Sequence, residues 1–156
     1  MINFDIKFKT PIKKLKFHKD AIRSLILLKD GRFASSSDDK SIIIYNKKTF
    51  SPDLIIKSAH NDSINDLINL SSGFIISCSI DWTIKLYNNI FKVIQILNYH
   101  KGPVYKIIEL NNKKLVSCSY DFTIIFYNKY NNKYKIDFQI STIDLCFNII
   151  QTKENE

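Results

Sequence analysis

The chain has 156 residues, enough for one domain around a single core, and its 45% hydrophobic and 24% charged residues are typical of a globular protein. Its net charge of +8 favours an anionic partner, but almost all of the positive charge is lysine. Only Arg23 and Arg32 offer the guanidinium forks usual in phosphate and guanine recognition. We therefore expect neither nucleic acid nor a membrane as the main partner.

In chain order, the first predicted elements are two strands over residues 4–8 and 12–17. Pro11 argues against a helix in this lysine-rich stretch. No apolar run here or later reaches the roughly 18 residues of a transmembrane helix. The N-terminus also lacks the continuous apolar region of a signal peptide.

Three segments follow, and each carries the same order of four predicted strands. The third strand of every segment is β-branched and ends in Tyr-Asn. Apolar first strands are predicted at residues 22–28, 64–70 and 104–110, Ser-rich second strands at 33–37, 74–79 and 115–119, and variable fourth strands at 54–58, 93–97 and 133–138. Residues 142–149 then predict one more first strand, and residues 151–156 a disordered tail.

The segments are repeats, because their His, Asp and Tyr residues recur with a step of 42 and then 40. A period of about 40 to 45 with four short strands per unit is typical of a β-propeller. Ala34, Cys78 and Ser36 supply small side chains on second strands, where neighbouring blades pack closely. We predict an all-β protein made of blades of four antiparallel strands.

The repeats resemble those of the WD-repeat family, whose units read Gly-His, Ser-x-Asp and Trp-Asp, over about residues 18–128. Phe17, Ala59 and Tyr99 replace the Gly, Tyr-Asn replaces Trp-Asp, and Trp82 is not at the Trp position. The resemblance implies a partial propeller over residues 1–150, open or incomplete. Its complete units lie at about 18–58, 60–98 and 100–139, and its partial blades at 1–17 and 141–150.

Each unit contains a Ser, a His and an Asp, the residue types of an acyl-transfer triad. The set recurs three times, whereas a catalytic site is usually unique, so we expect no enzyme activity. The resemblance implies a structural chain of hydrogen bonds from Asp to His, Ser and the aromatic residue that ends the third strand. These sets are His18, Ser35, Asp39 and Tyr45; His60, Ser77, Asp81 and Tyr87; and His100, Ser117, Asp121 and Tyr127.

The resemblance also implies where a partner binds, since the family's contact positions lie three and five residues after the His and just before the Asp. Exposed aromatic side chains near an arginine are typical of binding hot spots. We therefore predict an apolar, aromatic patch on the third unit and its neighbour, although Ile80 and Tyr120 packing only against adjacent loops is the alternative. The contact positions are Ala21, Arg23 and Asp38; Ser63, Asn65 and Ile80; and Pro103, Tyr105 and Tyr120.

Three units are fewer than the seven or so blades of a closed ring, and an open stack leaves apolar faces uncovered. Two chains forming one ring, a fragment of a longer propeller, and a small ring of four blades all remain open. We expect a scaffold that binds other proteins or peptides, with self-association to complete a propeller as one of these open possibilities. The alternative is a basic module for phosphoinositides or nucleic acid.

The three cysteines, Cys78, Cys118 and Cys146, indicate the compartment. An odd number of cysteines without a signal peptide favours free thiols in a reducing environment, so we expect the cytoplasm or the nucleus. Their spacing matches no metal-binding pattern. We expect neither a metal ion nor a cofactor.

Overall fold

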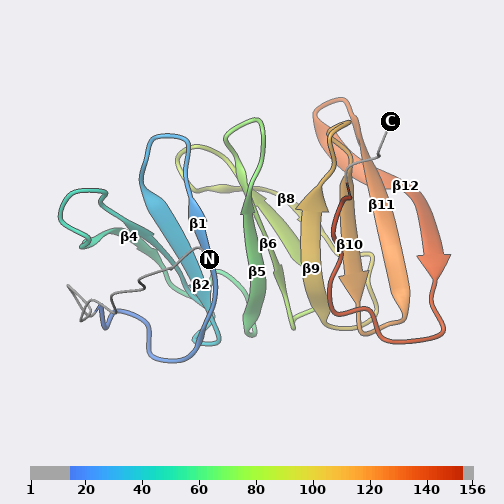
Figure 1. Cartoon of the computed structure of the whole chain (residues 1–156), viewed down its shortest axis with the longest axis horizontal. Coiled ribbons are helices and arrows are strands. Elements are labelled where there is room, and N and C mark those ends of the chain that lie inside the picture. The colour runs from blue at the N-terminus through green and yellow to red at the C-terminus, as the bar shows by residue number, and fades with distance from the viewer. Residues whose placement is uncertain (1–14, 153–156) are drawn as a thin grey trace, which may run out of the picture.

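The structure is a computed structural model that describes residues 15–152, and all regular secondary structure in this range is β-strand (Figure 1). No helix in this range is long and apolar enough to cross a membrane. The first sheet contains β1 (Ile22–Leu27), β2 (Phe33–Ser37), β3 (Ile42–Tyr45) and β4 (Pro52–Ile56). The second contains β5 (Ile64–Asn69), β6 (Ile75–Ser79), β7 (Ile84–Tyr87) and β8 (Val93–Leu97). The third contains β9 (Val104–Glu109), β10 (Leu115–Ser119), β11 (Thr123–Tyr130) and β12 (Lys133–Ser141).

Each sheet is one antiparallel blade whose four strands pair in chain order. Every blade has a bulge between its first two strands, as at Ile22 and Ser24, and another between its last two, as at Ile44 and Tyr45. Because a bulge increases the local twist of a strand pair, the recurring bulges give the blades the same twisted shape. The all-β architecture of four-stranded propeller blades predicted from the repeats is confirmed.

The blades stand side by side, and the first and third lie at opposite ends of an arc that does not close (Figure 1). Two clusters of buried apolar side chains fill the gaps between adjacent blades. Ile64 and Leu67 of the second blade pack on Ala34 of the first, and Val104 and Ile107 of the third pack on Cys78 of the second. Burying one such aliphatic side chain contributes about 1.5–3 kcal/mol, so contact between blades stabilises the fold. The small residues predicted on the second strands thus lie where inner strands meet.

Two predicted outer strands have different bounds in the structure. The strand predicted at 54–58 starts and ends two residues earlier, because Ser58 adopts a positive φ of 50° in the turn before the next blade. The last outer strand continues to Ser141 rather than ending at 138. Its hairpin turns at Asn131 and Asn132, both with positive φ, as a tight two-residue turn requires, and the pairing then continues along β11.

Residues 142–149 form no strand, so the prediction of a further first strand there is wrong. A first strand takes its hydrogen bonds from the second strand of its own blade, and within residues 15–152 no strand pairs with this segment. Residues 142–151, which we call the terminal segment, lie instead against the third blade. Phe147 packs on Tyr105 with ring centroids 4.8 Å apart, and the Asn111 amide donates to Gln151 Oε1 at 3.0 Å.

The strand predicted at residues 4–8 and most of that at 12–17 lie outside the described residues. Residues 15–17 belong to no strand. Most of the tail predicted at 151–156 also lies outside the described range.

Candidate partner-binding site

Each His lies at the centre of a series of side-chain hydrogen bonds. The series links the loop before the first strand to the turn after the second strand, and to the second and third strands themselves. In the first blade, His18 Nδ1 lies 2.9 Å from Asp39 and Nε2 lies 2.6 Å from the hydroxyl of Ser35. The Ser35 hydroxyl is 3.1 Å from the hydroxyl of Tyr45. His60 contacts Asp81 and Ser77 in the same way, and His100 contacts Asp121 and Ser117, with Tyr127 3.0 Å beyond Ser117.

The aspartates also hold the turn between the second and third strands. Asp81 accepts hydrogen bonds from the Asn61 amide at 2.9 Å and from the Thr83 amide and hydroxyl at 3.0 and 2.6 Å. One carboxylate therefore connects the loop that enters the blade to the turn at the same end. Asp39 bonds likewise to Lys19 and Ser41, and Asp121 to Lys101 and Thr123.

Burial and hydrogen bonding together set the protonation states of His60, His100 and Asp81 in this network. Desolvation lowers the pKa of His60 and His100 despite their aspartate partners, so both imidazoles are neutral at neutral pH. Burial acts to raise the pKa of Asp81, but hydrogen bonds from His60, Thr83 and the Asn61 amide outweigh it and bring the pKa well below its usual range. A neutral imidazole that donates from Nδ1 to a carboxylate must accept at Nε2. The hydroxyls of Ser77 and Ser117 therefore donate to His60 and His100, and the Tyr127 hydroxyl donates to Ser117.

The second blade departs from this pattern at its tyrosine. The Tyr87 hydroxyl donates to the Ala59 carbonyl at 3.3 Å, and Lys85 Nζ donates to the same oxygen at 2.7 Å. Burial raises the pKa of Tyr87 to about 12, while a hydrogen bond with Ser77 lowers it. Ala59 stands where the family usually has glycine, and its backbone carbonyl therefore takes part in the hydrogen-bond network of this blade.

The three Ser-His-Asp sets have the connectivity of a catalytic triad but not its access. Ser35, Ser77 and Ser117 are fully buried, so a substrate carbonyl has no route to a serine oxygen. Each serine hydroxyl also sits between the histidine and other buried groups of its blade. The geometry is that of a structural bond between loop and strand.

The positions expected to contact a partner come together in every blade. The amide of the residue before each Asp donates to the carbonyl three residues after the His: Asp38 to Ala21, Ile80 to Ser63 and Tyr120 to Pro103, at 2.8–2.9 Å. In the first blade, Arg23 Nε lies 2.8 Å from Asp38 Oδ1, so these charges neutralise each other. In the second, Asn65 donates to the Val104 carbonyl at 2.8 Å and helps to join two blades. Polar members of the predicted face are thus bound within the protein.

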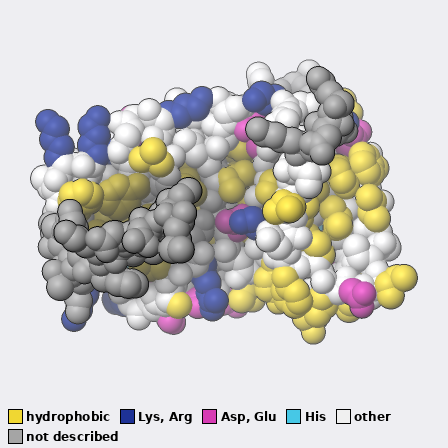
Figure 2. Space-filling model, in the orientation of Figure 1, with side chains coloured by type: hydrophobic (Ala, Val, Ile, Leu, Met, Phe, Trp, Pro, Cys, Tyr) yellow, Lys and Arg dark blue, Asp and Glu magenta, His cyan; other side chains and the backbone are white. Residues whose placement is uncertain are grey.

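The third blade presents an aromatic cluster at this end, formed by Tyr105, Tyr120, Phe122 and Phe147. Ring centroids lie 6.5 Å apart for Tyr105 and Tyr120, 6.3 Å for Tyr120 and Phe122, and 4.8 Å for Tyr105 and Phe147. Hydrophobic side chains gather along the lower right of the surface, below β9 and β10 (Figure 2). Of the predicted residues, Tyr105 and Tyr120 therefore lie together in an apolar patch.

Phe122 and Trp82 belong to this surface but were not among the predicted residues. Both directly follow the turn Asp, both have a positive φ (61° and 71°), and their exposed fractions are 43% and 51%. A bulky side chain in the left-handed region is uncommon and costs about 1–2 kcal/mol, so each aromatic residue is held at a strained, exposed place. The first blade has Lys40 at the same position. Bulky residues directly after each turn Asp were the available sequence signal.

Comparison with known proteins identifies the repeat. The family described as "WD domain, G-beta repeat" (WD40) matches residues 9–46, 51–88 and 91–128, which together make up more than half of the chain. The chain belongs to the WD40 family. In sequence comparison, none of the curated proteins matches it.

Solved WD40 structures share the fold. The WD40 β-propeller domain of Doa1 is 26% identical with a TM-score of 0.73, covering 82% of this chain and 43% of that one. The WD40 repeats of RRP9 are 20% identical with a TM-score of 0.70, covering 78% and 39%. U3-55K is 18% identical with a TM-score of 0.72, covering 81% and 41%. This chain therefore spans less than half of each of these solved chains.

The matched WD40 repeats are offset from the blades by one strand. The second match, 51–88, contains β4 of the first blade and β5 to β7 of the second, and the third match, 91–128, begins before β8. The second and third matched repeats therefore each supply strands to two blades and couple them covalently. WD40 propellers are generally non-catalytic scaffolds, in agreement with the buried serines. Within residues 15–152, no three His, Cys, Asp or Glu side chains gather as metal ligands.

Proposed function

We propose that this WD40 chain is a non-catalytic interaction module that binds a protein or peptide through the aromatic cluster of its third blade. The carrying observation is the cluster itself, four linked aromatic rings among otherwise internally bonded loops. Tyr120 is 49% exposed and Phe122 nearly as much, so both rings lose water-accessible area when a partner covers them. Rigid aromatic rings give large contact area at low entropic cost.

Backbone strain at Phe122 and Trp82 supports the same proposal. A Gly or Asn fits the left-handed conformation at far lower cost than an aromatic residue. Strained conformations of exposed residues concentrate at binding sites, where the side chain compensates for the strain. Lys40 has the same conformation at this turn of the first blade, so the turn imposes the strain, and it is the exposed ring at Phe122 that favours a binding role.

The two arginines give little support to the alternative function, a basic module that binds phosphoinositides or nucleic acid. Arg23 is bonded to Asp38 and Arg32 to Asp30, so both guanidinium groups already have carboxylate partners. Phosphoinositide or nucleic-acid recognition through either fork would first require breaking an ion pair. The protein-binding proposal needs no such rearrangement.

Asparagine substitutions test the proposal without removing any core side chain. We expect Phe122→Asn to lose proteins that the unmodified chain captures from cell extract, because the variant removes an exposed ring of the cluster and keeps the backbone conformation. Quantitative mass spectrometry of the captured proteins is the measurement.

Lys40→Asn is the matched control, since residue 40 has the same turn position and a φ of 68° but carries no ring. The control should capture the same proteins as the unmodified chain. Equal capture by all three forms would show that the aromatic cluster is not the binding surface.

We also infer that copies of the chain associate through the faces of their terminal blades. Leu25 and Leu27 on the first blade are 66% and 70% exposed, and Phe138 and Ile140 on the third are also exposed. The equivalent faces within the stack are buried against a neighbouring blade, so an added copy would cover them in the same manner. For the location, we propose the cytoplasm or nucleus, supported by three free thiols.

A further inference from the structure

The end of the blades opposite the aromatic cluster is strongly basic, and we call it the basic end. It is formed by the turns between the first and second and between the third and fourth strands, which lie at the upper edge of Figure 1. Lys and Arg side chains gather along the same edge in Figure 2. Together with the strand residues within two positions of them, these turns contain the acidic residues Asp30, Asp53 and Glu109, against the basic residues Lys29, Arg32, Lys47, Lys48, Lys92, Lys113, Lys114, Lys129 and Lys133.

The other end has no such excess. Its described loops contain the acidic residues Asp20, Asp38, Asp39, Asp62, Asp81 and Asp121 and the basic residues Lys16, Lys19, Lys40, Lys57 and Lys101. Within residues 15–152, the excess of positive charge is therefore concentrated at the basic end. A surface with one sign of charge attracts a partner of the opposite sign and speeds its association.

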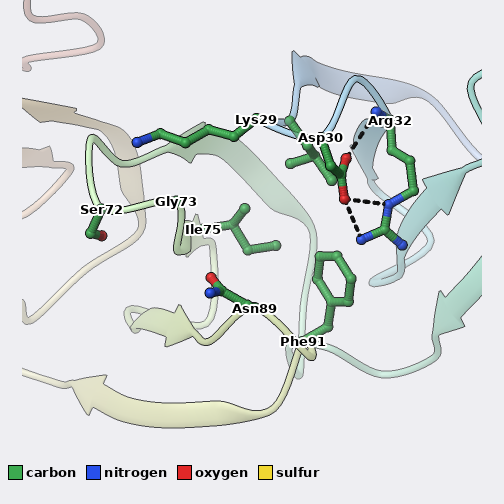
Figure 3. A pocket seen from close by; sticks show the side chains of 9 residues that line it. Lys29, Asp30, Arg32, Ser72, Gly73, Ile75, Asn89 and Phe91 are labelled. Atoms are coloured by element: carbon green, nitrogen blue, oxygen red, sulfur yellow. Dashed lines mark hydrogen bonds and ion pairs between the residues drawn. The ribbon is translucent and has the colours of Figure 1, made fainter.

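A pocket of about 300 Å³ opens at the basic end between the first and second blades (Figure 3). Leu28, Ile75 and Phe91 supply apolar walls. Arg32 is fixed at the rim, since its Nε lies 2.8 Å from Asp30 and its guanidinium carbon lies 5.1 Å from the centre of the Phe91 ring. Lys29 reaches across the mouth and donates to the carbonyl of Ser71 on the next turn.

A second pocket, of about 430 Å³, lies at the equivalent place between the second and third blades. Its apolar walls include Phe74, Leu86 and Ile94, and Lys129 stands 5.9 Å from the centre of the Tyr134 ring. Within the described residues, Lys129 has no carboxylate partner. Ser72 lines both pockets, so they are neighbours across a single turn.

We propose that the basic end binds an extended acidic peptide segment whose bulky apolar side chains enter the two pockets. The lysines match Asp and Glu side chains of the peptide, and the apolar walls match Leu- or Phe-sized groups between them. The bases of a single-stranded nucleic acid could stack on the aromatic walls, but the aliphatic walls, Leu28, Ile75, Leu86 and Ile94, match Leu-sized side chains better than planar bases, so an oligonucleotide is the competing outcome of the test. This proposal uses different residues from the aromatic cluster and does not rest on it.

Fluorescence anisotropy on the full chain tests the proposal with three labelled probes. The first peptide alternates Asp or Glu with Leu and Phe, the second replaces Leu and Phe by Ser, and the third probe is a single-stranded oligonucleotide. We expect Lys29→Glu with Lys129→Glu to weaken the first peptide about tenfold. The matched control, Lys57→Glu with Lys101→Glu, makes the same change in net charge at the other end and should weaken it less than about twofold.

The second peptide should bind about tenfold more weakly than the first, because its side chains cannot fill the pockets. Equal weakening by both double variants would overturn the proposal, since the effect would then be overall charge. Equal binding of the two peptides, or tighter binding of the oligonucleotide, would overturn it as well. A thermal melting curve of each variant confirms that the chain remains folded.

Discussion

A single histidine in each blade connects a loop, a turn and the strand core. Removing the imidazole of His100 leaves Ser117 without its acceptor and Asp121 without one donor, in a site that excludes water. We expect His100→Ala to lower the free energy of unfolding by about 2–4 kcal/mol, measured by urea denaturation.

Tyr127→Phe is the graded comparison for this histidine. It removes only one hydroxyl at the end of the chain, and its expected cost is about 1 kcal/mol. If Tyr127→Phe destabilised the protein as much as His100→Ala, the histidine would not be the centre of the network.

The buried histidines also make stability depend on pH. Their pKa values are lowered by folding, so the unfolded chain binds protons that the folded chain does not. Stability is therefore complete above the ordinary histidine pKa of 6.5 and falls below it, by at most about 1.4 kcal/mol per pH unit for each histidine. Aspartates such as Asp81, whose pKa is also lowered, add a second loss below their ordinary pKa of 3.8.

Urea midpoints between pH 8 and pH 5 measure this dependence. We expect the midpoint to decrease below about pH 6.5, and His60→Gln to reduce the slope because that group no longer titrates. A midpoint that stays constant or rises as the pH falls would contradict the neutral, buried state of the histidines.

The strained aromatic residues should affect stability in the opposite direction. Phe122→Asn replaces a bulky residue at a φ of 61° by one that tolerates the left-handed region, and we expect a gain of about 0.5–1 kcal/mol in the free energy of unfolding. Differential scanning calorimetry measures the gain. Loss of stability would mean that the ring packs on its neighbours strongly enough to outweigh the backbone cost.

Sequence reasoning located the hydrogen-bonding residues more completely than the binding surface. The His, Ser, Asp and Tyr positions recur in all three repeats, and the resemblance to WD repeats implied the hydrogen bonds that join them. Phe147 joins the aromatic cluster from a segment outside the repeats, and Trp82 and Phe122 occupy a position that is a lysine in the first blade. Features present in one blade give no periodic signal and need three-dimensional contacts to be found.

At the scale of strands, alternation and turn residues predicted the blades, and pairing partners decided the exceptions. The hairpin turn at Asn131 and Asn132 starts a β11–β12 pairing that continues past the bulge at Phe126 and Tyr127 as far as Ser141. The terminal segment has strand-like residues but no adjacent strand of its own blade, so it packs without a ladder of backbone hydrogen bonds. Local sequence cannot reveal whether such a partner is present.

Side chains between two blades should tolerate enlargement less well than side chains under the terminal segment. Substitution of small buried residues by leucine measures this difference. Ala34 and Cys78 lie where two complete sheets meet, and the sheets cannot move apart without losing apolar contacts and hydrogen bonds between blades, such as that from the Ser36 hydroxyl to the Ile64 carbonyl. We expect Ala34→Leu and Cys78→Leu each to lower the free energy of unfolding by about 1–3 kcal/mol in urea denaturation.

Cys118 provides the matched comparison, since it is equally buried at the repeat position but contacts Cys146 of the terminal segment. Cys118→Leu should cost less than Cys78→Leu, because the segment can shift without disrupting a sheet. Equal costs would indicate that the segment is held as firmly as a blade.

At the scale of the whole molecule, the two ends of each blade and the two ends of the stack have different surfaces. The blade ends divide into a basic end and an aromatic end, and the stack ends expose apolar side chains of β1 and β12. Internal faces with the same repeat positions are covered by the next blade, which is why sequence repetition predicted apolar terminal faces. The repeat sequence does not specify what covers the apolar terminal faces, because that depends on which molecules assemble with the chain.

Light scattering behind size exclusion measures whether copies cover these faces for each other. We expect a solution mass of about twice 18.3 kDa. Leu25→Glu with Leu27→Glu should give a single-chain mass, because two carboxylates cannot be buried unpaired in an apolar contact. Ile90→Glu is the control, since Ile90 is also 66% exposed but lies in a turn of the central blade, away from both stack ends. A single-chain mass for the unmodified protein, or equal dissociation by the control, would contradict association through the terminal blades.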